Sequence, residues 1–266
     1  MVRLATGESV LERAVRILDV FSPEAPALLV TEVARRSGLH VATASRLIAE
    51  LVELGLLARG DDRQVRVGVR LWELGLRASP TLSLRNAAMP PMEDLHAVVG
   101  QHTQLGVLEG NEVLFVERLS APGAVINITR IAGRLPLHAS SSGLVLLAHG
   151  SPALQERTLS HPLKSYTDKT ITSPAKLRAV LAAIRQQGYA FCPGHIHPDA
   201  AGIAVPVRDG RDKVVAALAV IVPNDGNAHS QVAALRTAAR GVTRRLAAPA
   251  PAEPAWQHGR NFPLNN

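Results

Sequence analysis

Side chains that can hydrogen-bond to nucleic acid gather in residues 31–54. Arginine can make a bidentate contact with guanine, and Ser, Thr and His can contact bases or phosphates. The spacing predicts two short helices joined by a tight turn at Ser37-Gly38-Leu39, which is typical of a DNA-reading helix-turn-helix. We therefore predict contacts with double-stranded DNA through this stretch and two arginines beyond it: Thr31, Arg35, Arg36, His40, Thr43, Ser45, Arg46, Arg63 and Arg66.

Within this set, Arg46 is the best candidate for a bidentate contact with guanine. Thr31 begins the first of the two helices, where free N–H groups can meet a phosphate. Glu50 and Glu53 lie further along the second helix on the same face as Arg46. Phosphates would repel them, so only the N-terminal half of that helix is expected to enter a groove. Helices that merely pack a small module would show a similar pattern.

Three consecutive hydroxyls, Ser140 to Ser142, precede an apolar segment that predicts a helix. Hydroxyls and free N–H groups at the start of a helix can hold a carboxylate. Ordinary capping of the helix by one serine would leave the same pattern. The residues alone favour neither explanation.

His195, His197 and Asp199 are the candidates for a metal site, because two imidazoles two residues apart share a face of an extended segment. Pro193, Gly194 and Pro198 lie among them and favour a loop with exposed histidines instead. We therefore predict no metal site and keep metal binding as the alternative.

Cys192 is the single cysteine, and a nearby histidine could make it a nucleophile. A lone cysteine is more often inert. The serines do not form a G-x-S-x-G motif, and the sequence contains no glycine-rich phosphate loop. These observations predict that the protein is not an enzyme and requires no cofactor.

The elements that position the DNA-reading residues are predicted from caps and periodicity. Ser9-Val10-Leu11-Glu12 has the spacing of a capping box and opens a helix that reaches about residue 21. The DNA-reading helix, expected over 41–54, has an apolar stripe. Its members are Ala44, Leu47, Ile48, Leu51 and Leu54.

After Gly55 the period changes to that of strands. Residues 56–59 and 64–71 read as a hairpin, since Val65, Val67, Val69 and Leu71 alternate with polar or basic residues. A basic hairpin after a DNA-reading helix is a wing. The sequence thus predicts a winged helix-turn-helix over 8–70 and a linker, 71–82, that contains a helix.

Strands and helices follow without regular alternation, which favours an α+β domain on a mostly antiparallel sheet over 83–246. Helices are predicted at 83–99 with a bend at Pro90-Pro91, at 142–149, at 174–187 between Ser173 and Gly188, and at 230–246. Strands are predicted at 103–108, 113–118, 124–129, 202–207 and 213–222, the last two joined by an Asp209-Gly210 turn. Residues 247–266 are Pro- and Ala-rich and are expected to be disordered.

The net charge of +7 suits a polyanionic partner, but its distribution is uneven. Residues 1–80 contain eleven Arg, no Lys and ten acids, so the predicted DNA-binding domain is nearly neutral. One copy would make few phosphate contacts, and affinity should depend on two copies bound together. This is an independent reason to expect a dimer.

The longest apolar run, Val214 to Val222, is too short to span a bilayer and predicts a buried strand. The N-terminal residues lack the apolar region of a secretory signal. One cysteine excludes an internal disulfide and fits a reducing compartment. We expect a cytoplasmic protein without a membrane partner.

The chain resembles the IclR family of bacterial transcription regulators over about residues 8–246. The order and spacing of six stretches carry the resemblance: SVLERAVRILDVF, VTEVARRSGL, VGVRLWELG, GRLPLHASSSG, TITSPAKLRAVLAAIRQQGYA and AVPVRDGRDKVVAALAV. The resemblance implies a winged helix-turn-helix, a linker helix and an effector-binding domain similar to GAF and PAS domains. It also implies dimers or tetramers on palindromic operators.

The resemblance further implies an effector site, with Ala139 to Ser142 on one wall. Cys192 stands where the family often has an acid, and Gly202 where it often has a cysteine. Ala219 and Ile221 stand where two serines are frequent. The implied effector-binding residues are Ala139, Ser140, Ser141, Ser142, Cys192, Gly202, Ala219 and Ile221.

With fewer polar anchors than the family pattern, this pocket is expected to take an effector with one anionic or polar end and a hydrophobic body, such as a hydrophobic acid. We therefore predict a ligand-responsive, DNA-binding transcription regulator that works as a dimer or tetramer. The alternative is a ligand- or metal-sensing module whose winged helix mediates protein contacts.

Overall fold

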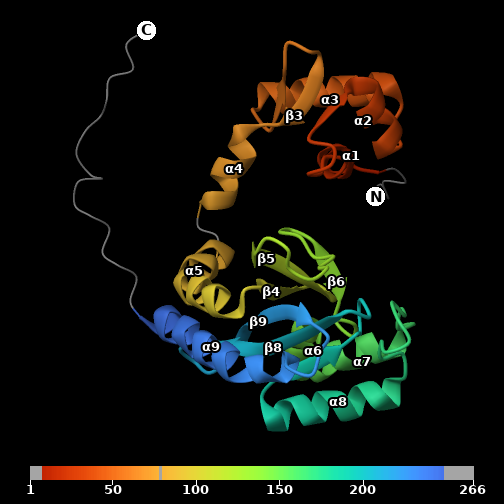
Figure 1. Cartoon of the computed structure of the whole chain (residues 1–266). Coiled ribbons are helices and arrows are strands. Elements are labelled where there is room, and N and C mark those ends of the chain that lie inside the picture. Colours follow the sequence, from red (N-terminus) through yellow and green to blue (C-terminus); the bar gives the residue numbers. More distant parts are fainter. Residues whose placement is uncertain (1–7, 78–79, 249–266) are drawn as a thin grey trace, which may run out of the picture. The chain divides into compact units, whose positions relative to one another are not determined.

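The chain divides into two compact units between residues 79 and 80 (Figure 1). The computed structural model describes residues 8–77 and 80–248. The expected disorder of the C-terminal tail concerns residues that, from 249 onward, lie outside this part of the chain. Each unit has its own buried apolar core, so each is described by itself.

The N-terminal unit combines short helices with a small antiparallel sheet (Figure 1). The helices are α1 Val10–Asp19, α2 Val30–Ser37, α3 Val41–Glu53 and α4 Val69–Leu76. The strands are β1 Ala27–Leu29, β2 Leu57–Arg59 and β3 Gln64–Val67, in the order β1-β3-β2. The capping box is confirmed, because Glu12 N–H donates to Ser9 Oγ and Ser9 N–H donates to Glu12 Oε2.

Helices α2 and α3 form the predicted helix-turn-helix. Gly38 ends α2 in the left-handed conformation, with φ of 66°, which glycine adopts without strain. Four of the five residues in the predicted apolar stripe of α3 are buried against α1 and α2: Ala44, Leu47, Ile48 and Leu51. Leu54 was predicted to be the fifth, but its side chain is 52% exposed at the C-cap.

The predicted second strand of the wing is too long. β3 stops at Val67, and Val69 to Leu71 belong to helix α4 instead. Gly68 forces the change, because a Cβ there would lie 2.1 Å from the carbonyl oxygen of Gly55. The chain passes so close to Gly55 that the hairpin ends here. The apolar alternation beyond Gly68 therefore belongs to the exposed surface of α4.

The C-terminal unit is built on one antiparallel sheet of six strands, in the order β6-β5-β4-β9-β8-β7 (Figure 1). Its strands are β4 His102–Glu109, β5 Glu112–Ser120, β6 Arg134–Pro136, β7 Ala190–Pro193, β8 Ala200–Arg208 and β9 Val214–Pro223. Its α-helices are α5 Pro80–Val99, α6 Ser141–Ala148, α7 Pro152–Ser160, α8 Pro174–Gln187 and α9 Val232–Ala247, and a short 3-10 helix covers Ala228–Gln231.

Helices cover both faces of this sheet. One apolar cluster joins the sheet to α6, α7 and α8, and a second joins it to α5 and α9. Neighbouring residues of β8 alternate between the two, as with Ala204 in the first and Ile203 in the second. None of the helices in the described part of the chain combines the length and the apolar character that a membrane crossing needs.

The cap signals of α8 are confirmed, with Ser173 at the N-cap and Gly188 in the left-handed conformation at the C-cap. The predicted strand at 124–129 is wrong, because these residues form a loop between β5 and β6 without a partner strand. Helix α5 runs without interruption through Pro90 and Pro91. Four short elements were not predicted: β1, β6, β7 and α7.

Candidate functional site

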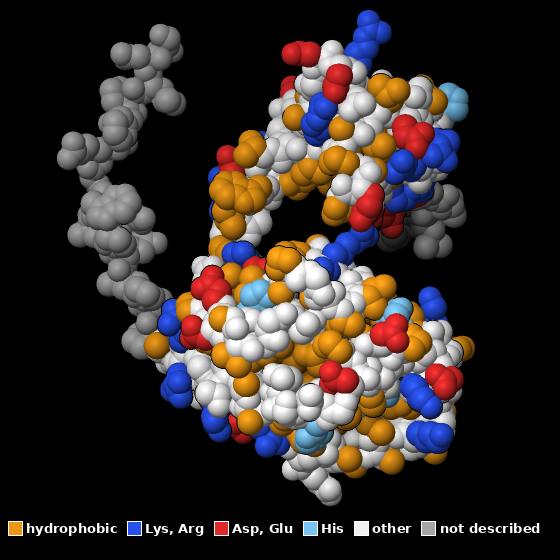
Figure 2. Space-filling model, viewed as in Figure 1, with side chains coloured by type: hydrophobic (Ala, Val, Ile, Leu, Met, Phe, Trp, Pro, Cys, Tyr) orange, Lys and Arg blue, Asp and Glu red, His pale blue; other side chains and the backbone are white. Residues whose placement is uncertain are grey.

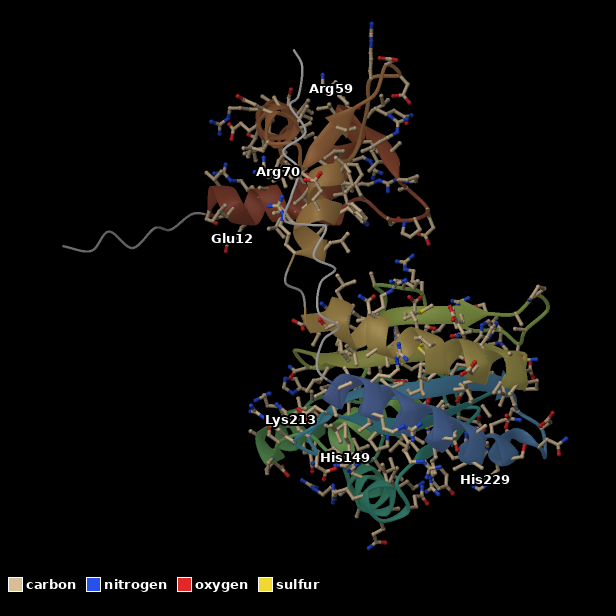
Figure 3. All side chains as sticks on the ribbon, turned by 90° about the vertical axis from the view of Figure 1, so that its left-hand side faces the viewer. Glu12, Arg59, Arg70, His149, Lys213 and His229 are labelled. Atoms are coloured by element: carbon tan, nitrogen blue, oxygen red, sulfur yellow. The ribbon has the colours of Figure 1, made fainter. Side chains whose placement is uncertain are left out.

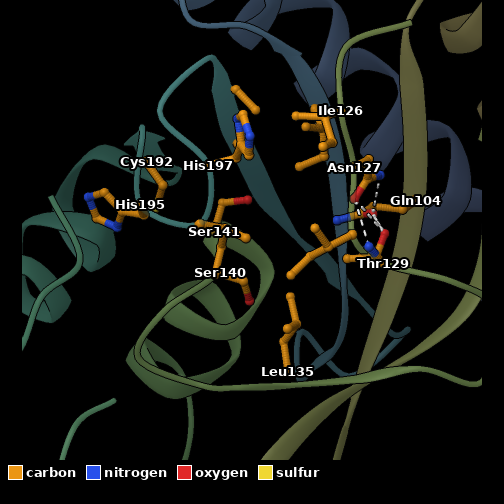
Figure 4. A pocket seen from close by; sticks show the side chains of 15 residues that line it. Gln104, Ile126, Asn127, Thr129, Leu135, Ser140, Ser141, Cys192, His195 and His197 are labelled. Atoms are coloured by element: carbon orange, nitrogen blue, oxygen red, sulfur yellow. Dashed lines mark hydrogen bonds between the residues drawn. The ribbon is translucent and has the colours of Figure 1, made fainter. Parts of the chain in front are cut away.

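A cavity opens on the α6 side of the sheet and contains about 450 Å³ of empty space, some of it open to solvent (Figure 4). Strands, α6 and the loop before β6 all contribute to its lining, which contains no Lys, Arg, Asp or Glu. The lining residues are Gln104, Ile126, Asn127, Ile128, Thr129, Leu135, Ser140, Ser141, Cys192, His195, Ile196, His197, Ala200, Gly202 and Ile221.

The serines at the start of α6 have different roles. Ser140 is the N-cap, and its Oγ accepts a hydrogen bond of 3.1 Å from Gly143 N–H. Ser141 is 2% exposed, and its buried Oγ has no hydrogen-bond partner in the described chain. Figure 4 shows this hydroxyl directed toward the cavity. Capping therefore accounts for Ser140 and leaves Ser141 available to a ligand.

A second polar group lies across the cavity from Ser141 (Figure 4). Gln104 on β4 is 1% exposed, and its Oε1 accepts a hydrogen bond of 2.7 Å from Thr129 Oγ1 and one of 3.3 Å from Asn127 Nδ2. Thr129 N–H also donates to Asn127 Oδ1 at 3.0 Å. Within the described residues no partner is found for Gln104 Nε2, so this amide can still donate.

Cys192 and Gly202 pair with each other on β7 and β8 at the edge of the cavity. Burial raises the pKa of Cys192 to about 12, so its thiol stays protonated and is a poor nucleophile. A Cβ on Gly202 would lie 2.9 Å from Ser141 Oγ. The absence of a side chain at 202 thus leaves room for the Ser141 hydroxyl.

Five of the eight predicted effector-binding residues line the cavity: Ser140, Ser141, Cys192, Gly202 and Ile221. Ala139, Ser142 and Ala219 do not line it and are fully buried beside it. Sequence reasoning missed the opposite wall, formed by Gln104 and the loop residues Ile126 to Thr129. The available signal was a glutamine in the predicted strand 103–108, next to the apolar Leu105.

The predicted metal candidates do not converge. His197 Nδ1 lies 3.8 Å from Asp199 Oδ2, whereas His195 is directed elsewhere and its buried Nδ1 has no partner in the described chain. Burial lowers the pKa of His195 and favours its neutral form. Over residues 8–77 and 80–248, no group of three or more His, Cys, Asp or Glu is placed to hold a metal ion. The two histidines line the cavity instead.

The predicted DNA-contacting residues lie on α2, α3 and the wing of the N-terminal unit. Two are half-buried, Thr43 and Arg66, and seven are exposed: Thr31, Arg35, Arg36, His40, Ser45, Arg46 and Arg63. His40 is the N-cap of α3, and its Nδ1 accepts a hydrogen bond of 3.3 Å from Ala42 N–H. Its imidazole is thus partly engaged in holding the helix.

The arginines of this surface differ in how far acids neutralise them. Arg35 and Arg36 both pair with Glu32, at 2.6 and 2.8 Å, and they lower the pKa of Glu32 to about 2. Arg66 pairs with Asp62. Arg46 on α3 has no ion pair among the described residues, which leaves its whole guanidinium free for a base.

Arg59 also lacks an ion pair within the described chain. It lies exposed at the end of β2, the first strand of the wing (Figure 3). Sequence reasoning overlooked it, because it falls at the end of a short strand with no periodic pattern around it. Arg63, exposed in the turn between β2 and β3, likewise has no ion pair among the described residues. Arg46, Arg59 and Arg63 are therefore the uncompensated charges of the reading helix and the hairpin in this part of the chain.

Comparison with known proteins covers both units. The family model of the IclR helix-turn-helix domain matches residues 10–61, and that of the bacterial transcriptional regulator IclR C-terminal domain matches residues 77–244. The HTH-type transcriptional regulator XynR of Escherichia coli (strain K12) is 32% identical over 212 residues, covering 79% of this chain and 84% of its own. KdgR of Dickeya chrysanthemi is 30% identical over 223 residues, covering 82% and 73%. These relatives are transcriptional regulators and not enzymes.

Two solved structures are more similar in sequence. An IclR homolog from Microbacterium hydrocarbonoxydans, complexed with 4-hydroxybenzoate, is 47% identical with a TM-score of 0.86, over 90% of this chain and 99% of that one. An IclR homolog from Microbacterium sp. strain HM58-2 is 46% identical with a TM-score of 0.60, over 90% and 98%.

Proposed function

This chain belongs to the IclR family of bacterial transcriptional regulators, and we propose that it binds a palindromic operator as a dimer or tetramer and is switched by a single-ring aromatic acid. The observation that carries the effector class is the unpartnered Ser141 hydroxyl facing the Gln104 amide across an apolar cavity. A regulator of this kind works in the cytoplasm, where bacterial DNA lies.

The cavity suits a flat ring with a polar group at each end. Ser141 and the N–H groups of the first turn of α6 favour an anion, since a helix N-terminus carries positive partial charge. Gln104 Nε2 can donate to a hydroxyl at the other end. The apolar side chains that line the space between are Ile126, Ile128, Leu135 and Ile221. The 47% identical homolog, complexed with 4-hydroxybenzoate, supports the same class of ligand here.

The surface of α4 supports assembly of two copies. No residue of this helix is buried, and Val69 and Trp72 are 69% and 66% exposed. Large apolar side chains gathered on one exposed helix are typical of a protein interface. A second copy packed on α4 would bring two reading helices to one palindrome and supply the phosphate contacts that one nearly neutral unit lacks.

The switch follows from differential binding. An effector that fits one arrangement of the assembled C-terminal units better than another shifts the population toward it. α4 ends the DNA-binding unit, just before the C-terminal unit in the chain, so this shift changes the spacing of the two reading helices and thereby the affinity for the operator. By linkage, operator DNA changes the affinity for the effector by the same factor.

Two measurements test the proposal. Footprinting on the intergenic DNA beside the protein's own gene should show a protected palindrome, and absence of binding at low salt would contradict the DNA-binding role. Calorimetry should show that 4-hydroxybenzoate binds more tightly than benzoate, which lacks the group for Gln104, and that Ser141→Ala weakens both. Tight binding of glyoxylate without binding of aromatic acids would contradict the effector class.

A further inference from the structure

Helix α9 carries an unusual concentration of positive charge. Its 16 residues include four arginines and no acid. Arg236, Arg240 and Arg244 are four residues apart, so they share one face of the helix and follow one another at steps of about 6 Å along its axis. All three are exposed, and Figure 2 shows basic side chains along the edge of the C-terminal unit that α9 forms.

A groove between α9 and β8 collects these charges. Arg236, Arg240 and Arg244 line it together with Arg208 of β8, over a floor of small residues that includes Pro206 and Ala239. We call this set of four arginines the basic stripe. Thr243 also lines the groove; its Oγ1 accepts a hydrogen bond of 3.3 Å from Arg208 N–H, which leaves the hydroxyl proton for another acceptor.

Most of the basic stripe has no acidic partner. Arg208 donates to the carbonyl of Asp212 at 2.7 Å and lies 3.4 Å from its carboxylate. Arg236 donates to the carbonyl of Gln187 and lies over the ring of Tyr189. Arg240 donates to a hydroxyl at 3.2 Å. No ion pair is found for the three α9 arginines in the part of the chain that the structure describes.

The distribution of charge along the chain also points to the C-terminal unit, which carries the basic stripe. Residues 1–80 hold eleven Arg and ten acids, so they account for only one unit of the net charge of +7. The remaining excess lies in the unit that does not carry the reading helix. A row of guanidinium groups without acidic partners is typical of a protein surface that binds the phosphate backbone of a nucleic acid.

We propose that the basic stripe binds the phosphate backbone of double-stranded DNA outside the operator half-sites; this inference rests on the proposed function. A row of three arginines spans about 12 Å, and B-DNA presents one phosphate charge per about 1.7 Å of its axis, so one face of the duplex can engage every member. The groove is open and its arginines follow one another along α9, which suits an extended polyanion better than a small anion in an enclosed pocket. Guanidinium groups bind phosphate in bidentate fashion.

The test compares DNA of two lengths with the full-length chain. One duplex contains only the operator defined by footprinting, and the other adds about two helical turns of unrelated sequence on each side. Binding is followed by fluorescence anisotropy over a range of NaCl concentrations. Each lost phosphate contact reduces the slope of log affinity against log salt by about 0.9.

The variant Arg236→Ala/Arg240→Ala/Arg244→Ala should lower this slope by about 2–3 per chain on the long duplex and leave it unchanged on the short one. Arg236 also donates to the Gln187 carbonyl, so the double variant Arg240→Ala/Arg244→Ala is measured in parallel. Its slope should fall by about two thirds as much as that of the triple variant. The matched control removes three exposed charges from α7 and α8: Arg157, Lys176 and Arg178. It should keep the wild-type slope on both duplexes.

An unchanged slope for both stripe variants on the long duplex would overturn this inference and leave the proposed function intact. An equal loss on the short duplex, or an equal loss in the control, would also overturn it, since the effect would then be general charge. Failure of the wild-type chain to bind either duplex would overturn the proposed function itself, together with this inference.

Discussion

Replacement of Gly202 by alanine should weaken effector binding by displacing the Ser141 hydroxyl. The backbone at 202 is not in the left-handed region, so alanine can adopt it, but the new Cβ would lie 2.9 Å from Ser141 Oγ. Cβ atoms in proteins do not approach other atoms this closely, so either the backbone at 202 or the Ser141 side chain must move. Ser141 Oγ has no hydrogen bond to hold it in the described chain, so we expect it to rotate out of the cavity.

The size of the loss follows from the bond that disappears. A hydrogen bond to a charged group contributes about 1.5–3 kcal/mol, and about 1.4 kcal/mol is a tenfold change in Kd. Gly202→Ala should therefore weaken 4-hydroxybenzoate binding roughly ten- to a hundredfold. The stability of the fold should fall by only about 1 kcal/mol, the lower end of the range for overpacking, because the atom that Cβ meets can rotate away.

Calorimetric titration of the two single variants and the double variant tests the reasoning. Ser141→Ala should weaken binding as much as Gly202→Ala. In the double variant the new Cβ meets the Cβ of residue 141 and Cδ1 of Ile221, both at 3.4 Å and both ordinary contacts, so its affinity should match that of Ser141→Ala alone. Wild-type affinity in Gly202→Ala, or losses that add in the double variant, would refute the proposed coupling.

Three further predictions concern other surfaces. Arg46→Ala should reduce operator affinity by about 1–3 kcal/mol in an anisotropy titration, whereas Arg35→Ala, whose guanidinium is already ion-paired, should lose less. Trp72→Glu should convert the assembly to monomers in analytical ultracentrifugation. The monomer should keep its melting temperature, because this side chain is 66% exposed and does not belong to the core. An intact dimer would exclude α4 as the interface. His195 has its pKa lowered by burial, so its contribution to stability is complete above about pH 6.5 and is lost as the pH falls through the folded-state pKa. Urea titrations at pH 7.5 and 5.5 should show a smaller decrease for His195→Gln than for the control His161→Gln, and equal decreases would contradict this assignment.

Elements with complete local signals could be predicted from the sequence. The capping box at Ser9 determines where α1 begins. Ser173 at the N-cap and Gly188 at the C-cap determine where α8 begins and ends. Each of these caps satisfies free backbone groups at a helix end. β1 has no such signal. Its three residues become a strand only because β3 lies alongside and accepts the pairing. Contacts between distant segments decide such elements, and one sequence does not display them.

Residues 124–129 have two different sides although they belong to no sheet. Ile126 and Ile128 are about half exposed, while Asn127 and Thr129 turn inward and hydrogen-bond to Gln104. A period of two requires only an extended chain with two different sides. Here residues from both sides of the loop line the cavity, and no neighbouring strand completes a ladder. The strand predicted over 124–129 was therefore wrong.

Gln104 shows most clearly what decides the candidate site. In the sequence, a polar residue on a strand resembles a surface position, because strands often have one solvated face. Its actual environment depends on strand order, since β4 lies between β5 and β9 and α6 covers the face opposite α5 and α9. A buried amide with an unused donor is unfavourable unless something accepts its hydrogen bond. The same reasoning applies to Ser141 once Ser140 has taken the cap. In the proposed function the Ser141 hydroxyl and the Gln104 amide, which face each other across the cavity, hold the two ends of the ligand, and only the fold brings these groups together.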